Sequence, residues 1–224
     1  MAGNPLPPQI NGNCAAPIEA LLIRWHHVLA EATDRMRPYA DLPYWYNERA
    51  NVGYVAQAAN ELGLAFLEEY TVNRGQGSEV HPGRGDLWIG DAARNEYEFE
   101  FKMYWASINT PDETLAENIE WYLDDAQEQL TAATRIVRTG MEDKPDKQPS
   151  QLSMVFVCPS VVESDQGRWK ELLKGFVDRI ARPEVYGNGF STVFVPPDDM
   201  QGSNRIGADD YLYPAIAVFG RTVR

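Results

Sequence analysis

Residues 96–105 alternate without exception between two kinds of side chain, and this segment constrains the fold of the chain more than any other. The even positions are polar: Glu96, Glu98, Glu100, Lys102 and Tyr104. The odd positions are aromatic or apolar: Tyr97, Phe99, Phe101, Met103 and Trp105. Successive side chains of a strand point to opposite faces of its sheet, so the segment predicts a strand with one aromatic core face and one polar face.

The segments around this strand predict an α/β protein with a mixed central sheet flanked by helices. Helices are expected where apolar residues recur at helical spacing: 17–37, 47–62, 110–138 and 167–181. Further strands are expected at 64–72, 86–90, 152–158, 191–195 and 212–219. The glycines within 73–85 indicate an exposed connection between two strands.

Composition narrows the class of protein. With 44% hydrophobic residues the chain can bury one sizeable core, and we expect a flexible tail over 1–16 followed by a single domain over 17–224. No apolar run is long enough for a membrane-spanning helix, and Cys14 and Cys158 suit a reducing compartment, so a cytoplasmic protein without membrane contact is expected. The net charge of −13 opposes nonspecific adhesion to nucleic acid, so any nucleic-acid role needs a local site.

The polar face of the 96–105 strand carries the chemistry. Glu100 and Lys102 share that face, and Asp86, which opens the preceding strand, can reach Glu100 across a hairpin. Two clustered carboxylates repel each other unless a cation joins them, and Mg²⁺ accepts such ligands while keeping positions for water and phosphate oxygens. The pattern therefore indicates phosphodiester chemistry, and its alternative is a solvent-exposed hairpin with an ordinary polar face.

Asp86 followed by Glu100-Phe101-Lys102 resembles the motif of the PD-(D/E)XK superfamily of restriction-endonuclease-like phosphodiesterases. The element order expected from residue 47 to 158 is similar to the αβββαβ core of that superfamily, with an extra N-terminal helix and C-terminal strands in this chain. Glu48 is similar to the acid that the family often carries on the first core helix, whereas Gly85 stands where the family has proline. The resemblance implies hydrolysis of DNA with Mg²⁺ or Mn²⁺ held by Asp86, Glu100 and Glu48, and with Lys102 assisting the attacking water.

Basic and aromatic residues supply candidate contacts to nucleic acid. The expected phosphate contacts are Arg74, Arg84, Arg168, Lys170 and Lys174. The aromatic residues of 39–46 could stack on bases or pack at a helix junction.

Other roles stay open. The acidic side of helix 112–138 is either a solvated face or a docking surface for a basic protein, and a dimer is compatible with the sequence. The alternatives to a nuclease are an inactive nuclease-like binding subunit of a larger assembly and a small acidic protein-interaction domain.

Overall fold

The computed structural model describes residues 8–74, 80–135, 148–197 and 211–223. The strands are β1 (Ile10–Gly12), β2 (Ala65–Arg74), β3 (His81–Gly90), β4 (Glu96–Ser107), β5 (Ala133–Arg135), β6 (Ser150–Ser160), β7 (Phe190–Phe194) and β8 (Ile216–Val223). The helices are α1 (Ala16–Met36), α2 (Glu48–Glu61), α3 (Asp112–Ala132), α4 (Trp169–Ile180) and α5 (Pro183–Tyr186), with 3₁₀ turns at Arg37–Tyr39 and Glu163–Arg168.

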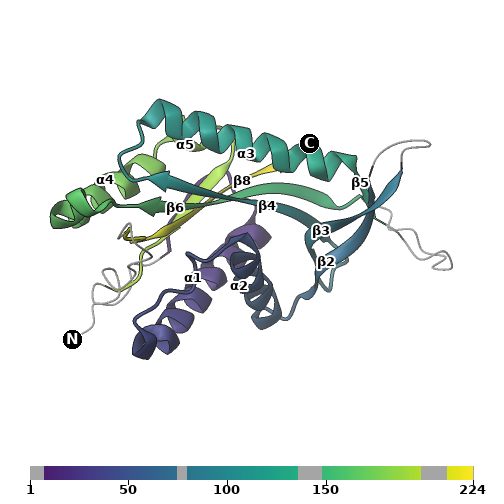
Figure 1. The fold of residues 1–224 in the computed structure, drawn as a ribbon. Coiled ribbons are helices and arrows are strands. Elements are labelled where there is room, and N and C mark those ends of the chain that lie inside the picture. Colours follow the sequence, from purple (N-terminus) through teal and green to yellow (C-terminus); the bar gives the residue numbers. More distant parts are fainter. Residues whose placement is uncertain (1–7, 75–79, 136–147, 198–210, 224) are drawn as a thin grey trace.

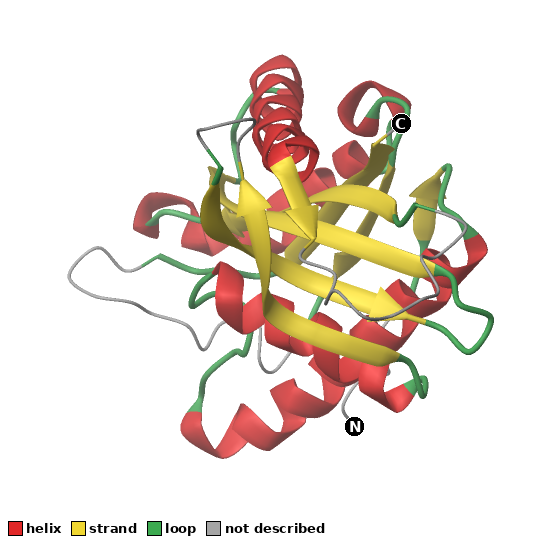
Figure 2. Cartoon of the chain, turned by 90° about the vertical axis from the view of Figure 1, so that its right-hand side faces the viewer, coloured by secondary structure: helices red, strands yellow, loops and turns green. Residues whose placement is uncertain are grey.

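The described strands form one mixed sheet with helices on both faces, which confirms the predicted α/β class (Figures 1 and 2). Its order is β1-β7-β8-β6-β4-β3-β2-β5, and β4 and β6 at its centre run parallel. Helices α1 and α2 cover one face, and α3, α4 and α5 cover the other, so each face has its own apolar core. None of the helices in the described ranges has both the length and the apolar content needed to cross a bilayer.

The alternation in β4 produces the predicted aromatic face. Phe101 is fully buried beneath α1 and α2 and stacks on Phe99 and on Phe156 of β6, with ring centroids 5.8 and 5.1 Å apart. The opposite face is not solvated, because α3 lies over it, and Glu100 is only 4% exposed. The charged side chains of β4 are therefore enclosed between the sheet and a helix, which a simple exposed hairpin would not do.

The predicted flexible tail over 1–16 is wrong where the structure describes it, and residues 1–7 lie outside the described ranges. Ile10–Gly12 form the edge strand β1, paired antiparallel with β7, and the Thr192 hydroxyl donates to the Gln9 carbonyl oxygen at 2.8 Å. The composition of this segment cannot reveal the strand, because the pairing edge is supplied by residues far later in the chain.

The predicted exposed connection over 73–85 is wrong in a way that matters for the site. Strand β2 continues to Arg74 and β3 begins at His81, so Gly83 and Gly85 are strand residues, while 75–79 lie outside the described ranges. A Cβ on Gly85 would stand 2.5 Å from Cζ of Tyr70, its partner on β2. Glycine is used here so that a cross-strand ring can lie over the backbone, which also explains why Gly85 precedes Asp86.

Replacing Gly85 by alanine should therefore lower stability by about 1 kcal/mol, since the Tyr70 ring has to move aside. Urea unfolding measures the loss. Gly175→Ala is the matched control, because nothing lies within 4 Å of a Cβ at this helical position and alanine favours a helix. Equal stability of Gly85→Ala and the wild type would contradict the close approach.

The end of the long helix also differs from the prediction of 110–138. Helix α3 ends at Ala132, and Ala133–Arg135 pair with the free edge of β2, with 136–138 outside the described ranges. The last strand is shifted to Ile216–Val223, whereas Leu212 makes an isolated bridge with Val161. In both places an available sheet edge, invisible in the local pattern, decides where regular structure lies.

Candidate active site

The candidate site lies where β3 separates from β4. Going away from the hairpin turn, Trp88 pairs with Glu98, and the last pair of the two strands is Leu87 with Phe99. Continuing this register places Asp86 opposite Glu100, but no pair forms there. Instead the N–H of Phe101 donates to Oδ2 of Asp86 at 2.8 Å, so a carboxylate takes a hydrogen bond that a strand would otherwise make.

Glu48 reaches the same edge of β4 from the first turn of α2. Asn47 caps this helix, accepting a hydrogen bond from the N–H of Ala50 at 2.8 Å, and the position of Glu48 is favoured by the helix dipole. Its carboxylate accepts a hydrogen bond from the N–H of Met103. The N–H groups of Phe101 and Met103, which point to the same edge of β4, are thus bound by Asp86 and Glu48.

Glu61, the competing acid at the other end of α2, does not belong to this site. Its carboxylate pairs with Arg24 of α1 and accepts from Gln57 at 2.9 Å. The acid that the structure brings near Asp86 is Glu48, whose ionisation responds to the charge of Asp86.

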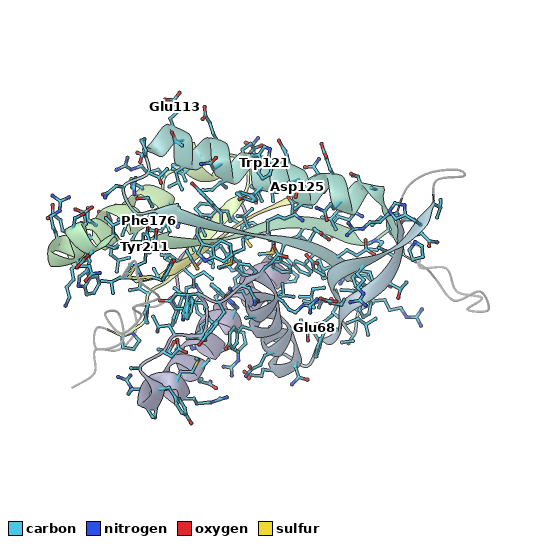
Figure 3. The ribbon with its side chains drawn as sticks, in the orientation of Figure 1. Glu68, Glu113, Trp121, Asp125, Phe176 and Tyr211 are labelled. Carbon is cyan, nitrogen blue, oxygen red and sulfur yellow. The ribbon has the colours of Figure 1, made fainter. Side chains whose placement is uncertain are left out.

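Lys102 connects β4 with α3. Its Nζ lies 3.4 Å from Oε1 of Glu100 and 3.3 Å from Oδ2 of Asp125, the α3 acid labelled in Figure 3. On the other side of Glu100, Nη2 of Arg74 lies 3.6 Å from Oε2. Glu100 is therefore flanked by two cations, and the lysine is held between two carboxylates.

The carboxylates of the site resist ionisation. Burial, followed by the negative charge of Asp86, raises the pKa of Glu48 to about 7, although Lys102 opposes this. The same two causes raise the pKa of Glu100 to about 7. Burial also raises the pKa of Asp86, against the N–H of Phe101 and the charges of Lys102 and Arg74. Acids perturbed in this manner mark a place where negative charge is concentrated without full compensation.

This concentration predicts a pH-dependent effect of Glu48→Gln. Between pH 4.5 and about 7 the folded protein keeps a proton on Glu48 that the unfolded chain has lost, so ionised Glu48 costs stability above about pH 7. Glutamine should raise stability by about 1 kcal/mol at pH 8, a gain of ~2–4 °C in melting temperature after allowing for partial exposure, and most of it should vanish at pH 5.

Thermal melts of the apo protein at both pH values measure this effect. Glu61→Gln is the control at the far end of the same helix. The pKa of Glu61 is lowered by its hydrogen bonds with Gln57 and Arg24, so its replacement should give no gain at pH 8. A gain for Glu48→Gln that is equal at pH 5 and pH 8 would exclude ionisation as its cause.

The donor set suits a hard divalent cation. Glu48, Asp86 and Glu100 offer only oxygen ligands, which Mg²⁺ and Mn²⁺ prefer. In the described parts of the chain, however, no three His, Cys, Asp or Glu side chains are grouped closely enough to hold a metal ion as they are placed. The contacts explain this, because Glu100 is directed to Lys102 and Arg74 while the other two carboxylates bind N–H groups of β4.

Of the predicted phosphate contacts, Arg74 and Arg84 lie beside the site, on β2 and β3 rather than in a loop. Arg84 pairs with Glu69 at 2.6 Å, and Glu69 also pairs with Arg49 of α2. Arg84 and Arg49 are 72% and 76% exposed, so both can turn to an external anion. Sequence reasoning missed Arg49, although it directly follows Glu48.

The other three predicted contacts are not brought to the site. Arg168 precedes α4 and pairs with Asp165, whereas Lys170 and Lys174 lie on α4, with Lys174 paired to Asp178. Figure 1 shows α4 at the opposite end of the molecule from β2 and β3. One phosphate group could not contact both regions.

Part of the acidic side of α3 is engaged within the protein. Glu120 and Asp124 both pair with Arg221 of β8. Asp125 was missed as a site residue because it is one acid among many on this helix. The available signal was that Asp125 directly precedes Ala126, a residue of the buried side of the helix, so its side chain lies near the side that packs on the sheet.

The fold and the site define a class: a mixed α/β protein with three carboxylates and a lysine gathered where two central strands separate. Comparison with protein-family models, with curated proteins and with solved structures gave no match.

Proposed function

We propose that this protein is a Mg²⁺- or Mn²⁺-dependent phosphodiesterase that hydrolyses DNA, with a restriction-endonuclease-like core. The observation that carries the proposal is the convergence of Glu48, Asp86 and Glu100 with Lys102 at the edge of β4. These residues come from α2, β3 and β4, and the resemblance of the sequence motif had singled out the same four.

The order of elements supports the same core. Helix α2 is followed by the antiparallel strands β2, β3 and β4, then by α3 and by β6, which returns parallel to β4. This is the αβββαβ order, with the short β5 inserted after α3.

Each side chain has a distinct task in this proposal. Asp86, Glu100 and Glu48 would hold the divalent ion, which when bound supplies a more acidic water and a positive charge beside the phosphate. Lys102 donates hydrogen bonds to the attacking water and to phosphate oxygens on which charge develops. Arg84 and Arg49 attract the neighbouring phosphates. Each gives up its ion pair with Glu69 and forms an ion pair with a phosphate of the substrate.

A second candidate function is a nuclease-like binding subunit that has lost catalysis. The specific observation in its favour is that Glu100 already lies between the cations Arg74 and Lys102, while no ready-made group of three metal ligands occurs among the described residues. The two candidates differ in one testable respect: the first needs a divalent ion and the second does not.

Cleavage assays on a supercoiled plasmid and on a single-stranded DNA circle, each with Mg²⁺ or Mn²⁺ and with EDTA as the blank, test the proposal. We expect nicking with either metal and none with EDTA. Absence of cleavage on both single-stranded and duplex DNA, together with an unchanged melting temperature on adding metal, would overturn the nuclease and favour the binding subunit.

A further inference from the structure

Beyond the site, the edge of β4 continues into a group of aromatic side chains, named here the aromatic ledge: Trp45, Tyr46 and Trp105. Trp105 lies three residues beyond Lys102, and its indole N–H donates to the carbonyl oxygen of Trp45 at 3.4 Å. The segment 45–48 therefore runs along β4 past Trp105 and Met103, in the space that β3 has left. The ledge and the candidate site share one strand edge.

The rings of the ledge are held in place yet partly uncovered. Trp45 stacks on Tyr46, with centroids 4.2 Å apart and planes inclined by 25°, and on Tyr213 at 6.2 Å. Asp41 binds both side chains of this pair, accepting from the indole N–H of Trp45 at 2.8 Å and from the hydroxyl of Tyr46. Tyr46 and Trp105 nevertheless remain 45% and 47% exposed. Because these rings are held in place before binding, they lose little conformational entropy when a flat partner stacks on them.

Tyr44, by contrast, has a structural role. It is fully buried, donates its hydroxyl hydrogen bond to the carbonyl oxygen of Tyr213 at 3.0 Å, and receives a hydrogen bond from Asn51 at its own carbonyl oxygen. In this segment Tyr44 is therefore a core residue, Trp45 is partly buried against the same core, and Tyr46 is exposed. Packing at a helix junction, one of the two alternatives for the segment, is therefore found for Tyr44, and stacking on bases stays a prediction.

We propose that the aromatic ledge stacks on unpaired bases next to the scissile phosphate, so that the site takes single-stranded or frayed DNA in preference to closed duplex. This inference rests on the proposed function for the identity of the polymer. In a closed duplex the faces of the bases are covered by their neighbours, whereas an unpaired base offers its face to an aromatic ring.

Distance and charge agree with this preference. Tyr46 lies two residues before Glu48, and Trp105 lies two residues of strand, about 7 Å, beyond Met103, whose N–H donates to Glu48. With a net charge of −13, and with the Asp41 carboxylate at the edge of the Trp45 and Tyr46 rings, the protein has little to gain from the dense phosphates of a duplex. Stacking is the remaining source of affinity that does not depend on phosphate charge.

Binding of a short fluorescently labelled single strand, followed by anisotropy in EDTA, tests the ledge without cleavage. We expect Tyr46→Ala and Trp105→Ala each to weaken binding about 5- to 100-fold, and Tyr46→Phe and Trp105→Phe to retain it. Trp121→Ala is the matched control. Trp121 is 62% exposed but lies on α3, on the face of the sheet opposite to α1 and α2, against which Trp45 packs (Figure 3), so its loss should leave binding to the ledge unchanged.

The outcomes separate this inference from the proposed function. Alanine variants that are folded, as judged by thermal melts, and that bind like the wild type would overturn the ledge even if the protein cleaves DNA. Tighter binding of the duplex than of the single strand would also overturn it. Ledge-dependent binding without cleavage in Mg²⁺ or Mn²⁺ would support the ledge and overturn the nuclease.

Discussion

Lys102→Ala should reduce Mg²⁺-dependent cleavage of DNA about 10²- to 10³-fold, the usual loss when a group that stabilises developing charge is removed. The ammonium group lies 3.4 Å from Glu100 at the centre of the carboxylate cluster, and its side chain is only 16% exposed, so no other described lysine can replace it there. The loss should fall on kcat rather than KM, because Lys102 acts on charge that appears in the transition state.

Lys174→Ala is the matched control for this prediction. Lys174 is exposed on α4 and pairs with Asp178, far from the site, and its loss should leave cleavage unchanged. Thermal melts of both variants separate chemistry from folding, since Lys102 also neutralises the buried Glu100. Cleavage at the wild-type rate by the Lys102→Ala protein would remove this residue from the mechanism.

Mg²⁺ or Mn²⁺ should raise the melting temperature of the protein by about 5–10 °C at a hundredfold excess over its dissociation constant, because a ligand of the folded state alone stabilises it by about 2.7 kcal/mol. At one fixed metal concentration the shift should be larger at pH 8 than at pH 6. The raised pKa values of Glu48 and Glu100, both about 7, mean that at pH 6 the metal has to displace protons. Each displaced proton weakens binding by up to about tenfold per pH unit.

Asp86→Asn should abolish most of this metal-induced shift, because a carboxylate ligand is replaced by a neutral amide. Asp34→Asn serves as the control, since Asp34 pairs with Arg37 at the end of α1 and takes no part in the cluster. A metal shift that is equal in the wild type and in Asp86→Asn, or that grows as the pH falls, would show that the ion binds elsewhere.

The strands and helices with strong local patterns were predictable from the sequence. The alternation of 96–105 identifies both faces of β4, and it places Glu100 and Lys102 on the same one. The cap Asn47 and the stop at Gly63 delimit α2, and they put Glu48 at the end of the helix where a carboxylate is favoured. These features depend on neighbours in the chain, and the physics of a single strand or helix is sufficient to derive them.

Tertiary structure alone decided how these elements enclose the site. Asp125 reaches Lys102 only because α3 packs across the polar face of β4, and Arg74 reaches Glu100 only because β2 extends into the segment predicted as a loop. Pairing with distant edges likewise made strands of Ile10–Gly12 and Ala133–Arg135. Such contacts join residues far apart in the chain, and their free energy comes from burial and edge pairing, which no local pattern encodes.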